Sequence, residues 1–518
     1  DNFHSDQTSD GMRKVEGNSA RTEIEYNLSK TDLLNFNVRY NNGKRQGGST
    51  ENISVYDFRN NLNQNSSTFS NNTEKSESYS YGLNYNKLFK DRNRSLTGEA
   101  VFSYDKEYEN EFKQTGFLFP LNTPTLFSKT DSKDLTKELN FQTDYSNPFF
   151  RTSKVEAGLK YNFRDTRADN LYYNQNNITG NYDIDTNLTD DFSFKENIVS
   201  AYAVYSNEGK DFTYNLGLRG EYWKYGLNQF NRNSEITKDR IDYFPSVSIS
   251  EKLGSTEEIS LSYSRRVRRP GFRDLSPETR IMSSIFYSKG NPDLSPEYIN
   301  SFELNFIKFF NEFSVTPSLF YKLTTNKISR YSTLIDSNIT LSTPVNANKE
   351  NSYGGELLIN GSISRMLSLN GSLSYFRQEI ILDSLGSNST NTFAGRLFAN
   401  LTLPWDAGVQ LTYFYRGKTV TPQGLVDPVS SFDVALKKDF FNKKLSLNFR
   451  VADIFNAQKM SGSTATDLYS QFFSRQRESR VASLTITYKF GSEDKNKKNE
   501  RKKRRPIDNP DSTNDPDF

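Results

Sequence analysis

Residues 257–310 read EEISLSYSRRVRRPGFRDLSPETRIMSSIFYSKGNPDLSPEYINSFELNFIKFF. Apolar and polar residues alternate over 257–267 and again over 298–309, and a loop rich in Pro, Gly and Arg joins the two segments. Because the side chains of a strand point alternately to its two faces, each segment predicts an amphipathic β-strand. The same unit of two such strands recurs through most of the chain.

The composition separates two explanations of this pattern. Only 34% of the 518 residues are hydrophobic, and the mean hydropathy is −0.77, whereas soluble domains are nearer to half apolar. Aromatic residues nevertheless make up 14%, and disordered chains are poor in aromatics. A membrane barrel needs only one apolar residue in two on each strand. We therefore predict an all-β fold, a transmembrane antiparallel β-barrel, rather than a disordered chain or a soluble β-protein.

The rare residue types exclude several classes of function. There is no cysteine, and His4 is the only histidine, which argues against a Ser-His triad and a multi-histidine metal site. We expect no enzymatic activity and no cofactor or metal. The net charge of +3 does not suggest nucleic-acid binding. No apolar run approaches the roughly 18 residues of a membrane helix.

Nineteen alternating segments predict strands. Charged residues on the lipid face are unfavourable, so the charged face of each strand should line the lumen. Short connections, expected at the periplasmic side, alternate with long ones at 43–74, 109–133, 166–194, 268–297 and 454–478. The segments are 18–28, 32–42, 75–88, 95–108, 134–146, 153–165, 195–206, 212–227, 240–252, 257–267, 298–309, 313–334, 339–364, 367–382, 392–403, 408–418, 429–438, 444–453 and 479–490.

An odd strand count conflicts with the even number usual in bacterial single-chain barrels. A strand missed within 43–74 or 109–133 would make twenty. Otherwise we expect at least one further strand upstream of Asp1, so that residues 1–490 are an N-terminally truncated barrel. Residues 491–518 are densely charged and rich in Pro, Asp and Asn, which predicts a disordered periplasmic tail.

Four stretches carry a family resemblance: SYSRRVRRPGFRDLSP (262–277), GNPDLSPEYINSFELNF (290–306), VADIFNAQ (451–458) and the terminal strand VASLTITYKF (481–490). Together they resemble the barrel of TonB-dependent outer-membrane receptors, and most closely the outer-membrane β-barrel family of Bacteroidetes, over residues 18–490. The terminal strand resembles a closing-strand signal, with Tyr488 and Phe490 at its end. The motif residues are Arg265, Arg266, Arg269, Pro270, Leu275, Pro277, Gly290, Asn291, Pro292, Leu294, Pro296 and Glu297.

The resemblance implies a 22-stranded barrel around an N-terminal plug domain, which contacts the TonB complex and drives energised uptake of a scarce solute. No plug-like segment is found in these residues, so three strands and the plug would lie outside them. The implied partners are outer-membrane lipid, the barrel-assembly machinery and a surface lipoprotein. The solute stays open between an iron chelate, an oligosaccharide, a vitamin and a peptide. The alternative function is a plug-free channel or a scaffold subunit of a larger envelope complex.

The arginines of the first motif have two interpretations. They could form a positively charged lumen rim that attracts an anionic ligand. Alternatively, they could pair with the loop acids Asp274, Glu278, Asp293 and Glu297 and keep the loop folded, which we favour. Three aromatic residues near the outer end of strand 212–227 are interpreted as an interfacial belt: Tyr222, Trp223 and Tyr225.

Overall fold

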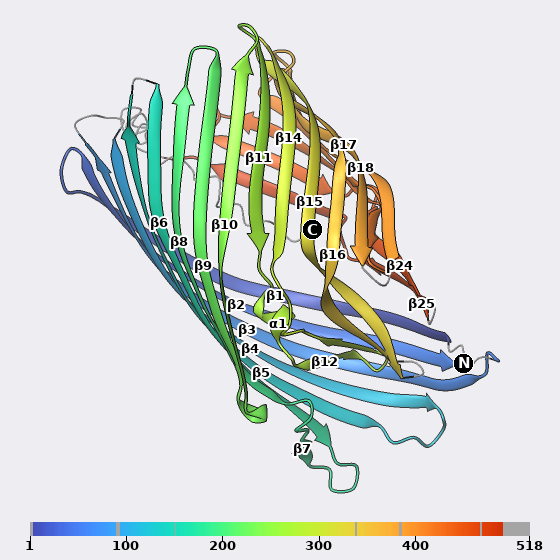
Figure 1. Cartoon of the computed structure of the whole chain (residues 1–518). Coiled ribbons are helices and arrows are strands. Elements are labelled where there is room, and N and C mark those ends of the chain that lie inside the picture. Colours follow the sequence, from blue (N-terminus) through green and yellow to red (C-terminus); the bar gives the residue numbers. More distant parts are fainter. Residues whose placement is uncertain are drawn as a thin grey trace.

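The computed structural model describes residues 4–57, 59–89, 94–150, 152–336, 339–382, 386–466 and 469–490. Within these ranges one sheet joins 22 strands, three of which are short pieces in the long loops. The other nineteen, here called the wall strands, form a strongly curved sheet (Figure 1). They are β1 (His4–Asn27), β2 (Asp32–Tyr56), β3 (Leu62–Leu88), β4 (Ser95–Phe119), β5 (Leu126–Pro148), β6 (Ser153–Gln175), β8 (Asp190–Glu208), β9 (Phe212–Gln229), β10 (Ser234–Lys252), β11 (Glu257–Arg268), β14 (Glu297–Phe310), β15 (Phe313–Asp336), β16 (Ile339–Ser362), β17 (Leu367–Leu382), β18 (Gly386–Leu403), β19 (Ala407–Arg416), β22 (Val429–Phe440), β23 (Leu445–Ala452) and β26 (Val481–Tyr488).

Each wall strand pairs antiparallel with the next one along the chain, and each overlaps one of the nineteen predicted segments. The predicted antiparallel all-β architecture is therefore confirmed. The wall is not closed in the described residues, because β1 pairs with β2 alone and β26 pairs with β23 alone. Every residue of these two edge strands is exposed.

The remaining elements belong to the long loops. The short strands of the main sheet are β7 (Tyr182–Ile184), β12 (Thr279–Ser283) and β13 (Phe286–Lys289), and β13 pairs parallel with β16. A separate four-stranded sheet contains β20 (Thr419–Thr421), β21 (Gly424–Val426), β24 (Lys459–Ala465) and β25 (Ser470–Gln476). The helical turns are α1 (Phe272–Leu275) and η1 (Phe230–Arg232). No helix in the described ranges is long and apolar enough to cross a membrane.

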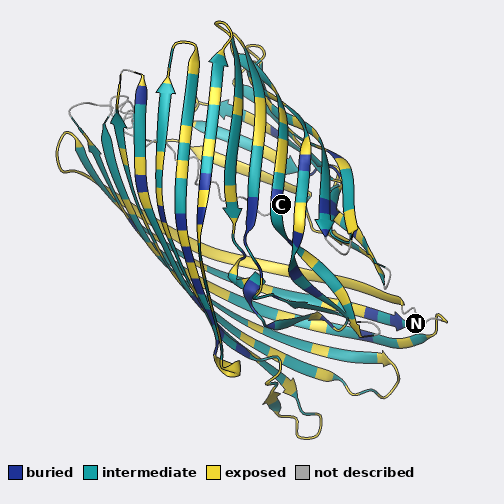
Figure 2. Ribbon diagram, viewed as in Figure 1, coloured by how far each residue is buried: buried dark blue, intermediate teal, exposed yellow. Residues whose placement is uncertain are grey.

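The two faces of the wall differ as the alternation predicts. On β9, Leu216 and Leu218 point outward with 45% and 56% of their surface exposed, while Arg219 and Glu221 lie on the lumen side. Exposed large apolar residues of this kind recur on neighbouring strands, and Figure 2 shows exposed positions along most of the wall. A large apolar surface on a strand-built wall is the face that a bilayer covers.

Three of the predicted long loops are mostly strand. β2 and β3 stay paired from Asp32 and Lys87 to Tyr56 and Leu62, so that residues 57–61 form the connection instead of 43–74. The loops predicted at 109–133 and 166–194 shrink in the same way to 120–125 and 176–189. Where the strands leave the bilayer, both of their faces meet water, so apolar residues no longer alternate with polar ones. The hydrogen-bonded pairing of the strands continues beyond this point.

One pair of wall strands separates along its length. β10 pairs with β11 from Ser246 and Ser264 to Lys252 and Glu258, whereas β11 stays paired with β14 as far as Arg268 and Glu297. In the described residues, positions 234–245 of β10 thus have β9 as a neighbour but not β11. At this level the β11–β14 hairpin is not tied to β10, although β14 stays paired with β15 as far as Tyr298 and Thr325.

Candidate functional site

The candidate site lies on the lumen side of the wall, where a cavity of about 280 Å³ opens between β5, β6, β8 and β9. Four cationic side chains and three carboxylates line it, so that the positive charges are slightly in excess. Arg164 Nε lies 2.6 Å from Glu138, and Glu196, which is opposite Arg164 in the register, accepts a hydrogen bond from Trp223 Nε1 at 2.7 Å. The ionic lining residues are Lys160, Arg164, Arg219, Arg269, Glu138, Glu196 and Glu221.

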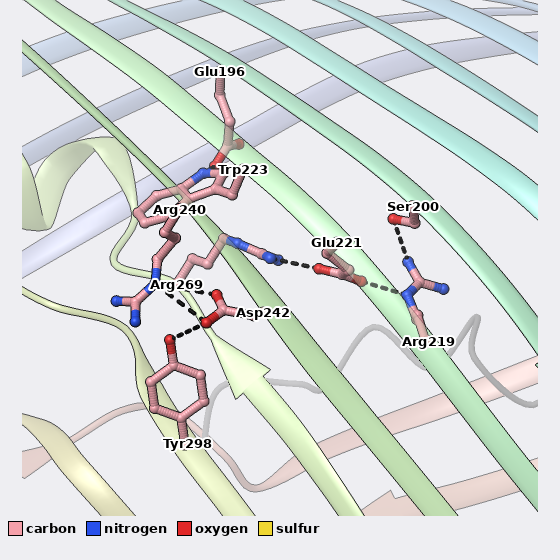
Figure 3. Close-up of polar contacts among 9 residues, drawn as sticks. All are labelled: Glu196, Ser200, Arg219, Glu221, Trp223, Arg240, Asp242, Arg269 and Tyr298. Atoms are coloured by element: carbon pink, nitrogen blue, oxygen red, sulfur yellow. Dashed lines mark hydrogen bonds and ion pairs between the residues drawn. The ribbon is translucent and has the colours of Figure 1, made fainter.

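Glu221 is the centre of this wall network (Figure 3). Its carboxylate, 6% exposed, accepts a hydrogen bond from Arg269 Nη2 at 2.5 Å and a second from Arg219 Nε. Arg219 also donates to Ser200 Oγ at 3.0 Å. Arg269 also lies 5.4 Å from the centroid of the Trp223 ring. This motif arginine therefore binds a carboxylate of the wall, Glu221, rather than an acid of the loop. Charge-assisted contacts of this kind fix the loop on the lumen face of β9.

A second contact holds the root of the loop against β10. Asp242 is 7% exposed and accepts a hydrogen bond from the Tyr298 hydroxyl at 2.7 Å, and Arg240 Nε lies 3.2 Å from the same carboxylate. Arg265 lies 4.8 Å over the Tyr298 ring. One aromatic side chain of the hairpin, Tyr298, and one cationic side chain, Arg265, therefore cover the lumen side of β10.

These contacts reveal the path of the hairpin. Arg265 shares a face of β11 with Leu261, which is 56% exposed on the outside of the wall. Asp242 lies on the lumen side, between the outward Ile241 and Tyr243. Arg265 reaches this neighbourhood because the hairpin bends inward after Ser264, past the end of its pairing with β10. The face of the hairpin that points outward lower in the wall therefore contacts the lumen side of β10 at this level.

Glu297 closes the far end of the loop. The side chain is 1% exposed, and its Oε1 accepts a hydrogen bond from the Ile328 backbone N–H at 2.6 Å. Arg268 Nη1 lies 3.2 Å from the same oxygen. The predicted pairing of motif arginines with loop acids therefore holds for Arg268 and Glu297, whereas Asp293 lies 3.5 Å from Lys238 of β10.

Gly290 and Asn291 join the two halves of the loop. A Cβ at Gly290 would lie 2.3 Å from the backbone oxygen of Ser276, a distance that no side chain tolerates. Asn291 donates its backbone N–H to Asp274 O at 2.6 Å and its side-chain amide to Pro344 O at 3.2 Å. The glycine is thus required by the close approach of two backbone segments.

Two leucines of the motifs anchor the loop in an apolar cluster. Leu275 and Leu294, 0% and 2% exposed, pack with residues from the lumen face of β9 and β8. The belt interpretation of Trp223 and Tyr225 is therefore wrong, because both are 2% exposed beneath the loop, whereas Tyr222 faces outward at 38%. The strand period places 223 and 225 on the same side as Glu221. The cluster contains Phe194, Trp223, Tyr225, Leu227, Leu275, Leu294 and Ile328.

The other predicted residues fall into two groups. Pro270 and Pro296 are buried, Pro277 and Pro292 are half-buried, and the Pro292 carbonyl accepts a hydrogen bond from Lys238 at 2.9 Å. Arg266 is exposed and lies apart from the contacts that hold the loop. Tyr488 ends β26 with 63% exposure, and Phe490 follows at 90%. The predicted tail, 491–518, lies outside the described residues.

Sequence reasoning did not identify the wall partners of the loop: Glu221, Asp242 and Lys238. The strand period of 212–227 and 240–252 marks Glu221 and Asp242 as lumen residues, and this was the available signal, whereas Lys238 precedes the predicted strand 240–252. It does not indicate which loop reaches them. The described ranges hold no cluster of three or more His, Asp or Glu residues that could bind a metal ion.

Comparisons with known proteins agree with this architecture. The model of the outer membrane protein beta-barrel family matches residues 87–488. No curated protein matches the chain. Among solved structures, the siderophore receptor PiuA from Acinetobacter baumannii superposes with a TM-score of 0.61 at 13% identity, over 93% of this chain and 81% of that one.

Two further solved structures are similar. The ferric-catecholate import receptor Fiu from E. coli K12, in its closed form, has a TM-score of 0.58 at 12% identity, over 93% of this chain and 81% of that one. The copper transporter OprC has a TM-score of 0.55 at 12% identity, over 93% and 79%. At these identities the likeness shows the fold. The family and these structures are barrels and transport proteins, in agreement with the prediction of no enzymatic activity.

Proposed function

Because the chain belongs to the outer membrane protein beta-barrel family, we propose that it is the barrel portion of a TonB-dependent receptor for energised uptake of a scarce solute. The observation that carries this proposal is the inward loop 269–296: Arg269 at its start binds Glu221, and Glu297 and Tyr298, which follow its end, bind Ile328 and Asp242. A loop fixed inside the lumen narrows the passage, as a barrel that admits only selected solutes requires.

The charged cavity supports the same proposal. Its fixed cations and carboxylates suit contact with a polar plug domain, which the TonB complex would engage. The names of the similar structures make an iron chelate or a metal ion the first solutes to test. An oligosaccharide, a vitamin and a peptide belong to the same proposal, as does a surface lipoprotein partner.

Transport in cells tests the function. The full-length gene product is expressed in its host, and uptake of radioactive iron is followed with a panel of ferric chelates. We expect uptake that stops when an uncoupler collapses the proton gradient and when TonB is deleted. Uptake that survives both treatments, together with steady conductance of the purified protein in planar bilayers, would establish the alternative of a plug-free channel.

We also propose that further strands complete the wall between β1 and β26. An unpaired strand edge in a bilayer leaves backbone groups unsatisfied at several kcal/mol each. β1 leads into the short turn at 28–31, and Tyr488 at the end of β26 pairs with Leu445 beside the short turn at 441–444, so that both edges run in the same direction. Antiparallel closure therefore needs an odd number of strands between them. On this view 1–490 is barrel and 491–518 a periplasmic tail.

Spin labels test the closure. Cysteine is absent from the chain, so Thr22→Cys in β1 and Thr485→Cys in β26 place one label on each edge. Three interposed strands separate the edges by about 19 Å, at about 4.8 Å per strand. A distance of about 5 Å, the spacing of direct neighbours, would contradict the proposal. Labels at Thr22 and Val38, which are opposite each other in β1 and β2, calibrate the measurement.

A further inference from the structure

An apolar hollow of about 380 Å³ lies on the outer face of the wall, near the short turns of the last strands. It is separate from the lumen site, and leucine, alanine and phenylalanine side chains from five wall strands line it. The lining residues used below are Leu403, Ala407, Leu436, Leu447, Phe449 and Leu484. Leu436 and Leu484 are 52% and 61% exposed, so the hollow faces the bilayer.

The register explains why the wall is hollow here. Leu436, Phe449 and Leu484 form one outward row across β22, β23 and β26. The next row toward the short turns runs through Ala407 and Lys438, which are opposite each other in β19 and β22. The small side chain of Ala407 leaves space between its larger neighbours. A space with this shape and lining suits a hydrocarbon chain.

A lysine stands at the mouth of the hollow. Lys438 shares the outward face of β22 with Leu436 and Phe440, and its Nζ lies 5.7 Å from the centroid of the Phe440 ring. The same ammonium donates a hydrogen bond to the backbone oxygen of Trp405 in the neighbouring turn. A lipid-facing lysine costs about 2–4 kcal/mol at mid-membrane and about 0–1 kcal/mol near the interface. Its place beside the turn fits an interfacial charge.

Aromatic side chains mark the same depth. Trp405 is 83% exposed at φ 63°, and Phe441 is 74% exposed at φ 53°. The left-handed region is unfavourable for bulky side chains, so the two turns keep these rings exposed at a conformational cost. Trp and other aromatic residues accumulate where acyl chains meet headgroups. The rings thus indicate the level of the glycerol groups.

The charge around the turns favours an anion. Lys443 and Lys444 are exposed in the turn after β22, and Lys489 follows β26 directly beside them, since its N–H bonds to Lys444 O. Two acids lie nearby: Asp439 is bound to Ser446 Oγ at 2.5 Å and lies 3.2 Å from Lys437, and Asp406 is exposed beside Trp405, so the lysines outnumber the acids. Cations that cluster at a membrane surface attract anionic lipid headgroups.

We propose that this hollow binds an anionic glycerophospholipid of the periplasmic leaflet. One acyl chain occupies the space above Ala407, the phosphate contacts the Lys438 ammonium, and the rings of Trp405 and Phe441 lie at the glycerol level. The assignment of the leaflet rests on the short turns being periplasmic, the usual arrangement in bacterial barrels. The site does not depend on which solute the barrel transports.

Tryptophan quenching tests the site in the full-length protein, reconstituted in phosphatidylcholine vesicles. The emission of Trp405 is obtained as the difference between the protein and its Trp405→Phe variant. Phosphatidylglycerol or phosphatidylcholine with brominated acyl chains is then titrated in. We expect brominated phosphatidylglycerol to reach half-maximal quenching at an about five-fold lower mole fraction, which corresponds to about 1 kcal/mol for one lysine at an anionic surface.

Matched variants separate a site from general charge attraction. Lys438→Met should abolish the preference, and Lys438→Arg should restore it. Lys30→Met removes an exposed charge from another short turn, 28–31, and should leave the preference unchanged. Ala407→Leu fills the hollow and should raise the half-maximal mole fraction for both lipids. Retained heat-modifiable mobility in gels verifies that each variant is folded.

Two results would overturn the proposal. Equal quenching by the two lipids in the unmodified protein would show that no anionic lipid is bound at this place. An equal loss of preference in Lys30→Met and Lys438→Met would show attraction by net charge alone. Neither result bears on energised uptake, because no transport is measured.

Discussion

The extended end of the β2–β3 hairpin, residues 43–74, and the 269–296 loop both connect wall strands on the side of the long loops, yet they are stabilised differently. β2 and β3 continue their ladder to Tyr56 and Leu62, and a five-residue connection, 57–61, joins them. The loop has little ladder of its own and bends into the lumen, where Leu275 is completely buried. The hairpin therefore depends on backbone hydrogen bonds and the loop on side-chain packing.

The hairpin and the loop differ in how well they tolerate a change of side chain. A Cβ at Gly48 of β2 would meet the nearest atom, Ser70 O, at 3.8 Å, an ordinary contact, whereas at Gly290 the nearest atom would be 2.3 Å away. Leu118, near the end of β4, is 64% exposed. Substitutions in the extended hairpins should cost little, and those in the loop should cost much.

Removing the buried leucine is expected to have the largest effect. Leu275→Ala deletes a fully buried side chain and leaves a cavity, so the free energy of opening the loop should fall by about 3 kcal/mol. Hydrogen exchange of the peptide spanning 272–296 measures this opening. Leu118→Ala is the matched control and should change the opening of β4 by less than about 0.5 kcal/mol. Equal effects at both sites would remove the distinction between the regions.

Adding one carbon at Gly290 is expected to be the next largest effect. Gly290→Ala forces its Cβ against Ser276 O, and overpacking of this kind costs about 1–3 kcal/mol. The loop should then be cleaved faster by protease added from the extracellular side of intact cells. Gly48→Ala in β2 should leave the cleavage rate unchanged. Resistance of the Gly290 variant would mean that the backbone segments can separate without unfolding the loop.

The smallest expected effect is an opposite response of the two regions to pH. Hydrogen bonds from Asn61 lower the pKa of Asp57, so its contribution to the 57–61 turn is present above the ordinary carboxyl pKa and is lost as pH falls through the lowered value. Burial raises the pKa of Glu278 in the loop, although Arg280 opposes the shift. The loop should therefore be most stable when Glu278 is protonated and should weaken as pH rises toward the raised pKa.

Hydrogen exchange between about pH 3 and about pH 7, corrected for intrinsic rates, measures both responses. Protection of 57–61 should increase with pH while protection of 272–283 decreases. Asp57→Asn and Glu278→Gln should each flatten the response of their own segment only. Parallel slopes in the two segments would show that the pH dependence is global.

The strand count was predictable because every wall strand carries the apolar-polar alternation while it crosses the bilayer. The strand ends were not, because residues 43–56 and 62–74 have polar residues on both faces and resemble loop. Backbone hydrogen bonds alone extend these strands, and they leave no alternation of apolar and polar residues from which the strand ends could be predicted.

The site was predictable in its residues but not in its arrangement. The motifs identified Leu275, Gly290 and Glu297, which the structure buries or packs closely. Alternation places Arg265 on the outward face of β11, where a charge is unfavourable. Arg265 avoids the lipid because the hairpin bends inward after Ser264. The same bend brings the loop within reach of Glu221 and Asp242. A bend of this kind depends on tertiary contacts between distant segments.

The separation of β10 from β11 has a mechanical consequence. A continuous ladder around a cylinder resists changes in its cross-section, since each strand is tied to a neighbour on both sides. Besides the open edges at β1 and β26, the ladder is interrupted beyond the Ser246–Ser264 pair, because residues 234–245 are tied on one side only in the described part of the wall. The circumference is therefore more compliant at the end of the long loops than at the end of the short turns, and a force on the 269–296 loop would deform the mouth before the base.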